Sequence, residues 1–102
     1  MKDRSELLRQ ILAERPGDTL ARYGLAMEYL KAGRAEEAVA EFRTLIAANP
    51  GYTYAYYHAG QALEKLGRMG EARAMYEAGL AHAADAHSRS ELQAALDLLP
   101  ED

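Results

Sequence analysis

The sequence repeats itself with a period of 34 residues, and this repeat limits the possible folds more than any other feature. The segment KAGRAEEAVA at 31–40 aligns with KLGRMGEARA at 65–74. The same spacing pairs Phe42 with Tyr76. A fixed period of this kind predicts stacked copies of one supersecondary unit, because a single copy cannot bury its own apolar face.

Each unit has the pattern of two helices joined by a short turn. In the first unit, apolar residues at helical spacing lead up to Gly33, where glycine suits the left-handed backbone that ends a helix. A second amphipathic helix is expected to begin near residue 34 or 35, and the NPG sequence at 49–51 ends it. The second unit predicts helices over about 54–66 and 70–83.

The spacing of small and large residues in both units resembles the tetratricopeptide repeat, a helix–turn–helix unit of the same period. The resemblance covers residues 19–86 and departs from the family pattern at two positions. Arg22 stands where a large aromatic residue is usual, and its stem could cover apolar surface while its head reaches water. Ala84 stands where the terminal proline belongs, so the last helix of the second unit is expected to run on by a few residues. The signature positions are held by Leu25, Ala26, Tyr29, Ala38, Phe42 and Pro50 in the first unit and by Tyr56, Ala59, Gly60, Leu63, Ala72 and Tyr76 in the second.

The resemblance implies an all-α fold, an α–α superhelix of about six helices in a single domain. We place an N-terminal capping helix in 1–18, the two repeats in 19–52 and 53–86, and a C-terminal capping helix in 87–102. Capping elements are expected because an end repeat otherwise exposes its apolar side.

Both end segments carry helical signals of their own. Leu8, Ile11 and Leu12 form an apolar stripe in the N-terminal segment. In the C-terminal segment, Ser88 and Glu91 have the spacing of a capping box, in which each side chain bonds to a backbone N–H at the helix start. Each end helix is therefore predicted to cover one side of the neighbouring repeat.

In this family the first helix of each unit lines a concave groove, and the second forms the outer wall. The resemblance therefore places Tyr56 in the core and directs Tyr54 and Tyr57 at the groove, where the C-terminal helix could cover part of this face. Tyrosine suits recognition because it offers a large rigid apolar surface and a hydroxyl group. The candidate ligand-binding residues of the groove are Tyr23, Met27, Leu30, Lys31, Tyr54, Tyr57, Gln61 and Lys65.

The sequence offers no convincing catalytic, metal or cofactor site. It contains no cysteine and no glycine-rich phosphate loop, and its serines lie at predicted helix starts, where capping explains them. His58, among tyrosines, is typical of a packed or surface residue. His82, Asp85 and His87 carry metal-binding groups, but their spacing straddles a predicted helix end and matches no zinc signature. We therefore predict no enzyme activity, no metal and no cofactor.

Composition narrows the possible partners. The 16 acidic and 12 basic residues give a net charge of −4, which disfavours nucleic acid. No segment approaches the ~20 apolar residues of a membrane span, and the N-terminal segment lacks the apolar run of a secretory signal. We therefore predict a cytoplasmic protein with no membrane partner.

One known ligand class of the family can be examined from the sequence. Tetratricopeptide domains that hold the C-terminal carboxylates of heat-shock chaperones use a clamp of lysine, arginine and asparagine on their inner helices. That clamp is absent here, which favours peptides that carry apolar or aromatic side chains. The corresponding positions include Tyr23, Met27, Tyr57, His58 and Gln61.

These observations support three hypotheses about function. The leading one is a non-catalytic module that binds a peptide or a partner protein through its concave groove. The chain resembles short bacterial tetratricopeptide proteins of unassigned role. The alternative is a structural homodimer in which exposed end helices complete their cores across the interface. A third, weaker hypothesis is an enzyme or metal protein that uses the histidines.

Overall fold

The computed structural model describes residues 3–100, and these contain six α-helices and no β-strand. The all-α prediction is confirmed. The two helices predicted in the second unit each begin and end one residue earlier than expected. The outer bounds of the two predicted capping segments, residues 1 and 102, lie outside the described residues. The helices are α1 (Arg4–Glu14), α2 (Thr19–Lys31), α3 (Ala35–Ala48), α4 (Thr53–Lys65), α5 (Met69–His82) and α6 (Ala86–Leu98).

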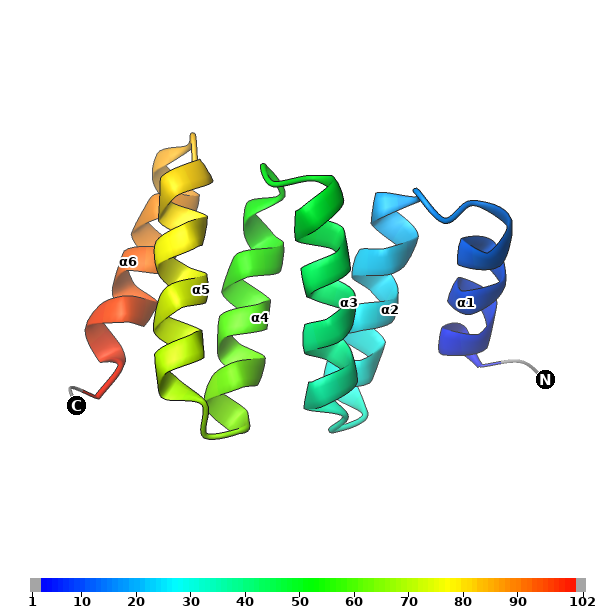
Figure 1. The fold of residues 1–102 in the computed structure, drawn as a ribbon, viewed down its shortest axis with the longest axis horizontal. Helices are drawn as coiled ribbons and strands as arrows, with labels where there is room; N and C mark the ends of the chain where they lie inside the picture. The colour runs from blue at the N-terminus through cyan, green and yellow to red at the C-terminus, as the bar shows by residue number, and fades with distance from the viewer. Residues whose placement is uncertain (1–2, 101–102) are drawn as a thin grey trace.

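The helices stand side by side along the longest dimension of the molecule (Figure 1). In this view α2 lies behind α3, and α6 lies behind α5. We call α1, α3 and α5 the outer wall and α2, α4 and α6 the inner wall. Consecutive helices pack against each other, and α4 also contacts α6. The Cα atoms extend over 44 × 28 × 19 Å, as expected for a stack in which each helix contacts its neighbours.

The turn inside each unit depends on one glycine. Gly33 and Gly67 have φ angles of +78° and +76°, in the left-handed region that side chains with a Cβ disfavour. In the first turn the N–H of Arg34 donates to the carbonyl of Tyr29 at 2.8 Å, which satisfies one of the free carbonyls at the end of α2. The two units therefore reverse direction in the same way.

Two large rings from the outer wall fill the core. Phe42 of α3 and Tyr76 of α5 are fully buried. Small residues on the inner wall make room for them, since a Cβ on Gly60 of α4 would lie 2.2 Å from the ring of Tyr76. The predicted core position of Tyr56 is also confirmed, and its hydroxyl donates to the carbonyl of Pro50 at 2.6 Å. Close packing of these rings fixes the separation of the two walls.

The predicted capping box at the start of the last helix is wrong. Asp85 is the cap, and its carboxylate accepts a hydrogen bond from the backbone N–H of Ser88 at 2.9 Å. Ser88 lies one turn into the helix and is buried, whereas Glu91 contacts the imidazole of His87 at 2.7 Å. The sequence contains two good capping residues three positions apart, and the earlier one begins the helix. Aspartate also caps α1 through Asp3 and α2 through Asp18.

The two departures from the family pattern do not behave as predicted. The head of Arg22 is not free in water but bound to neighbouring groups: it pairs with Glu41 at 2.6 Å and donates to the carbonyl of Pro16 at 3.1 Å. The predicted extension of α5 is also wrong, because the helix ends at His82 and Ala83 has extended backbone angles. A proline is therefore not needed to end this helix.

Both end helices cover the neighbouring repeat with their apolar stripes. In α1, Leu8 and Leu12 are buried against Ala21 and Leu25 of α2. The buried apolar residues of the C-terminal segment, Leu92, Ala95 and Leu99, join the main core.

The close approach of Tyr76 to Gly60 predicts a large effect for a small substitution. Gly60→Ala should destabilise the protein by about 1–3 kcal/mol, because the added methyl group overlaps a ring that is held on all sides. The matched control is Gly70→Ala in α5, where a Cβ would meet nothing within 4 Å, so that alanine should be neutral or stabilising by up to about 1 kcal/mol. Urea unfolding of both variants measures the difference, and equal stabilities would contradict the packing described.

Candidate functional site

The N-terminal half of the inner wall contains an open cavity of about 510 Å³ between α1 and α2. Tyr23 and Met27, two of the predicted groove residues, line it from α2. Leu20 extends the same face and is 74% exposed. Leu8 and Ile11 of α1 contribute the opposite side. The capping helix therefore forms one side of the candidate groove.

A second cavity, of about 670 Å³, follows at the end of the inner wall where α2 and α4 finish. Four predicted groove residues meet there: Met27, Leu30, Lys31 and Lys65. The two cavities share Arg4, Met27 and Glu28, so they form one continuous surface along α2.

The C-terminal half of the predicted groove is largely closed. Thr53, Tyr54 and Tyr57 of α4 face Ser88, Glu91 and Leu92 of α6 across a space of only about 10 Å³. Tyr54 is still 50% exposed, whereas Tyr57 is half-buried and packs against the core. The C-terminal helix thus covers part of the face that the sequence assigned to the groove.

Gln61 has a structural partner that the sequence did not reveal. Its amide donates to the hydroxyl of Tyr76 at 2.7 Å, and that hydroxyl donates to the carboxylate of Glu64 at 2.5 Å. Burial, together with the nearby Glu64 carboxylate, raises the pKa of the Tyr76 phenol, so the hydroxyl remains a donor. Gln61 therefore holds a core ring in position and offers less to a ligand than predicted.

Aromatic rings connect the groove to the core. The ring of Tyr23 lies 5.3 Å from Tyr52 and 5.9 Å from His58, measured between centroids. His58 in turn lies 5.4 Å from Tyr57. These contacts hold Tyr23 in one orientation, and a surface with its side chains already ordered loses less entropy on binding. Burial lowers the pKa of His58, while Glu91 opposes this effect more weakly, so His58 is neutral at pH 7.

Sequence reasoning missed Arg4 and Glu28, which line both cavities. Arg4 lies 34 positions before Ala38, a signature position that is normally small. The arginine at that position was the available signal that the surface of α1 differs there from the surface of the second helix in each repeat.

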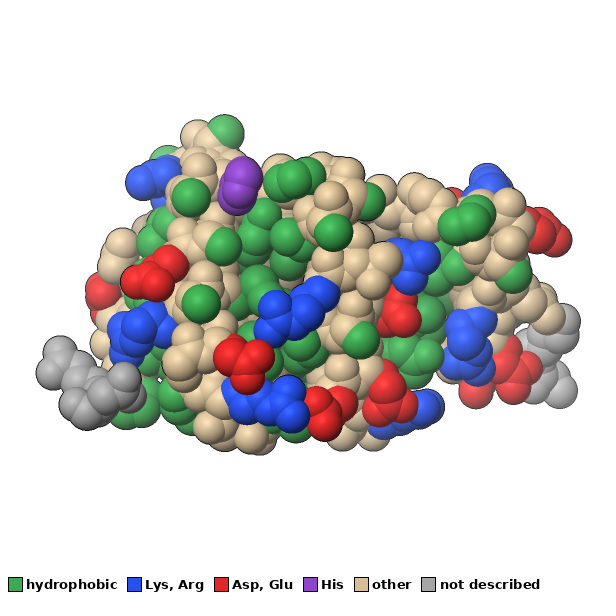
Figure 2. Space-filling model, viewed as in Figure 1, with side chains coloured by type: hydrophobic (Ala, Val, Ile, Leu, Met, Phe, Trp, Pro, Cys, Tyr) green, Lys and Arg blue, Asp and Glu red, His purple; other side chains and the backbone are tan. Residues whose placement is uncertain are grey.

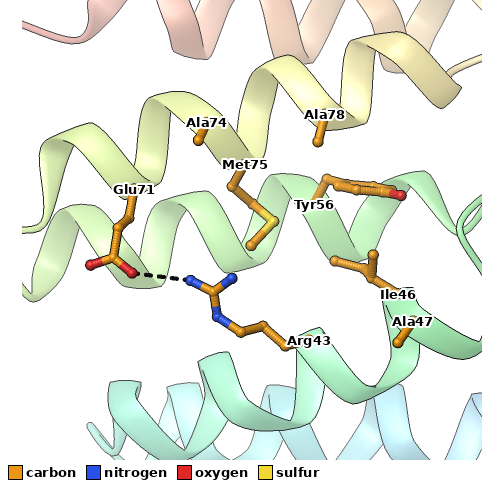
Figure 3. A pocket seen from close by; sticks show the side chains of 8 residues that line it. All are labelled: Arg43, Ile46, Ala47, Tyr56, Glu71, Ala74, Met75 and Ala78. Carbon is orange, nitrogen blue, oxygen red and sulfur yellow. Dashed lines mark hydrogen bonds and ion pairs between the residues drawn. The ribbon is translucent and has the colours of Figure 1, made fainter.

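The outer wall has a hollow of its own. Figure 2 shows it between α3 and α5, with hydrophobic side chains at its base. Its volume is about 460 Å³, and Arg43 crosses it to pair with Glu71 at 3.2 Å (Figure 3). Met75 points into the space, and Tyr56 forms part of its base (Figure 3). This hollow is a second place where a partner could bind, and it serves below as a control surface.

The three residues considered as metal ligands are engaged separately. The ring of His82 stacks on Tyr56 at 5.8 Å, Asp85 caps α6, and His87 contacts Glu91. Within residues 3–100, no group of three histidine, cysteine, aspartate or glutamate side chains is arranged to hold a metal ion.

Comparison with known proteins identifies the family. A tetratricopeptide repeat family model matches the chain over residues 5–53 and again over 23–89. The chain belongs to the tetratricopeptide repeat family. Tetratricopeptide repeats generally mediate protein–protein interaction, and the family fold is a non-catalytic scaffold.

Solved structures of tetratricopeptide proteins resemble this one closely. The crystal structure of a tetratricopeptide repeat domain protein from Salinibacter ruber is 36% identical, covers 78% of this chain and 91% of its own, and gives a TM-score of 0.70. A solution structure of such a domain from the same organism is 37% identical, covers 79% of this chain and 85% of its own, and gives a TM-score of 0.73. A protein from Bordetella parapertussis is 29% identical over 97% of this chain and 89% of its own, with a TM-score of 0.81. No curated protein matches the sequence significantly.

The helices also bear on membrane spanning. In the part of the chain that the structure describes, no helix is long and apolar enough to cross a lipid bilayer.

Burial of His58 predicts a specific pH dependence of stability. Its pKa in the folded state lies below the usual value of about 6.5, so the unfolded chain takes up the proton first as the pH falls. Stability should therefore decrease as the pH drops through about 6.5 towards the folded pKa, and His58→Gln should remove this part of the decrease. Urea unfolding between about pH 7.5 and 5.5 measures it. An unchanged slope in His58→Gln would contradict the burial.

Proposed function

We propose that this tetratricopeptide repeat protein is a non-catalytic binding module that holds a peptide, or an extended segment of a partner protein, on its inner wall. The observation that carries this proposal is the continuous surface formed by the two cavities along α2. Their volumes, about 510 and 670 Å³, are typical of ligand sites, which fall in the range of about 300–1,000 Å³.

The chemistry of this surface favours apolar side chains of a partner. Leu20, Tyr23 and Met27 follow one another along α2 at helical spacing, and all three line the first cavity. Tyr23 is already fixed by its ring contacts, which suits it to act as an anchor. Tyr54 adds a half-exposed ring on α4.

The homodimer hypothesis has weaker support. Leu7 on α1 and Leu98 on α6 are exposed near opposite ends of the stack, and they are the features that favour it. However, the exposed residues of α6 are mostly polar, and among them Gln93 donates to Asp97 at 3.0 Å. An interface that completes a core needs a contiguous apolar face, and single exposed leucines are normal on a soluble protein.

Capture experiments with matched variants test the proposal. Leu20→Glu places a charge in the groove at a residue that is 74% exposed, so the fold should be unaffected. Ala78→Glu places the same charge in the hollow of the outer wall. Proteins captured from a lysate of the source organism by the wild type should be retained by Ala78→Glu and lost by Leu20→Glu. The opposite pattern would place the binding surface on the outer wall and refute the proposal.

A further inference from the structure

Three cationic side chains from three different helices converge on the second cavity. Arg4 begins α1, Lys31 ends α2 and Lys65 ends α4, and all three line the same space. Among residues 3–100, Glu28 is the only one that brings a carboxylate to its lining. Positive charge is therefore concentrated at this end of the groove, although the chain as a whole carries a net charge of −4.

Helix geometry explains only part of this arrangement. Lysine in the last turn of a helix is favoured by the helix dipole, which accounts for Lys31 and Lys65 on structural grounds alone. Arg4 is at the opposite kind of position, the first turn of α1, where the dipole disfavours a cation. The Arg4 side chain is instead held at the cavity by its contact with Glu28 of α2.

The single carboxylate leaves most of the positive charge uncompensated. Glu28 contacts Arg4 and Lys31 at the same distance, 3.6 Å, through the same oxygen. Both contacts are longer than a charge-assisted hydrogen bond, which is about 2.7–2.9 Å. Lys65 forms no ion pair with any residue between 3 and 100, and the Lys31 side chain is 80% exposed. Two positive charges in excess thus face the solvent at this cavity.

Apolar surface adjoins these cations and continues along the inner wall. Met27 and Leu30 line the cationic cavity, and Met27 also lines the cavity that holds Leu20 and Tyr23. Leu20 and Lys31 are eleven residues apart on one helix, which corresponds to about 16 Å. An extended segment of about five residues spans that length. One short segment can therefore reach both the apolar and the cationic end.

From this arrangement we infer that the partner of the inner wall is an extended segment in which apolar side chains adjoin aspartate or glutamate. The apolar side chains lie over Tyr23 and Met27, and the carboxylates pair with Lys31, Lys65 and Arg4. The inference rests on the proposed function, because it assigns a chemistry to the same groove. It commits to side-chain carboxylates within the segment rather than to a free carboxyl terminus.

A phage-displayed library of random linear peptides, fused at their carboxyl ends, tests the inference on the intact protein. The displayed peptides have no free carboxyl terminus, so any preference for acid comes from side chains. Selection on the wild type should enrich peptides with aspartate or glutamate beside large apolar residues. A synthetic peptide of the enriched sequence should bind at least about tenfold more weakly to Lys31→Glu/Lys65→Glu, and its binding should weaken with added salt.

The control variant reverses two charges away from the groove, Arg9→Glu/Arg15→Glu, and should bind the selected peptide like the wild type. Three outcomes are distinguishable. An acid preference that disappears with the two groove lysines supports the inference. The inference is overturned if the selected peptides need Leu20 but show no acid preference. It is also overturned if they need Leu20 but bind the lysine variant as well as the wild type. In both cases the groove function still stands. Peptides that bind equally to Leu20→Glu overturn the groove function itself.

Discussion

The insertion of one large ring from each of α3 and α5 between the two walls is the interaction on which the rest of the structure depends. Tyr76 reaches across the core until its hydroxyl contacts Gln61 and Glu64 on the opposite wall. The ring fits only because position 60 is glycine. The distance between the walls, and with it the shape of the inner surface, follows from this contact. Phe42 has the equivalent role in the first unit, where its ring lies 6.1 Å from Tyr23.

This contact also explains why the inner wall is ordered before any partner binds. Tyr23 packs on Phe42 from the groove side, and the ring of His58 completes the contact between the two inner helices. A partner therefore meets side chains that are already fixed by the core. The two halves of the inner wall differ, however, because α6 covers α4 while the surface along α2 stays open. We therefore propose that recognition is concentrated on the first unit and on the capping helix beside it.

Much of the fold could be predicted from the sequence because the repeat imposes the same local packing twice. The core positions of Phe42, Tyr76 and Tyr56 follow from the signature positions of the family that the repeat resembles. The start of α6 could not be predicted, since Asp85 and Ser88 are both suitable caps and only the tertiary position of the helix selects between them. The role of Gln61 was also out of reach, because it depends on a hydroxyl fifteen residues away that approaches from the other wall. Arg4 and Glu28 belong to the groove only through the packing of α1 on α2, which no motif encodes.

We propose that the inner wall along α2 is the recognition surface of this protein. Amide chemical shifts of the ¹⁵N-labelled protein, followed during titration with a captured partner segment or a selected peptide, test it most directly. We expect the changes to cluster at residues 20–31 and at the end of α4 near Lys65. Changes centred on the outer-wall hollow, around Arg43 and Ala78, would contradict it.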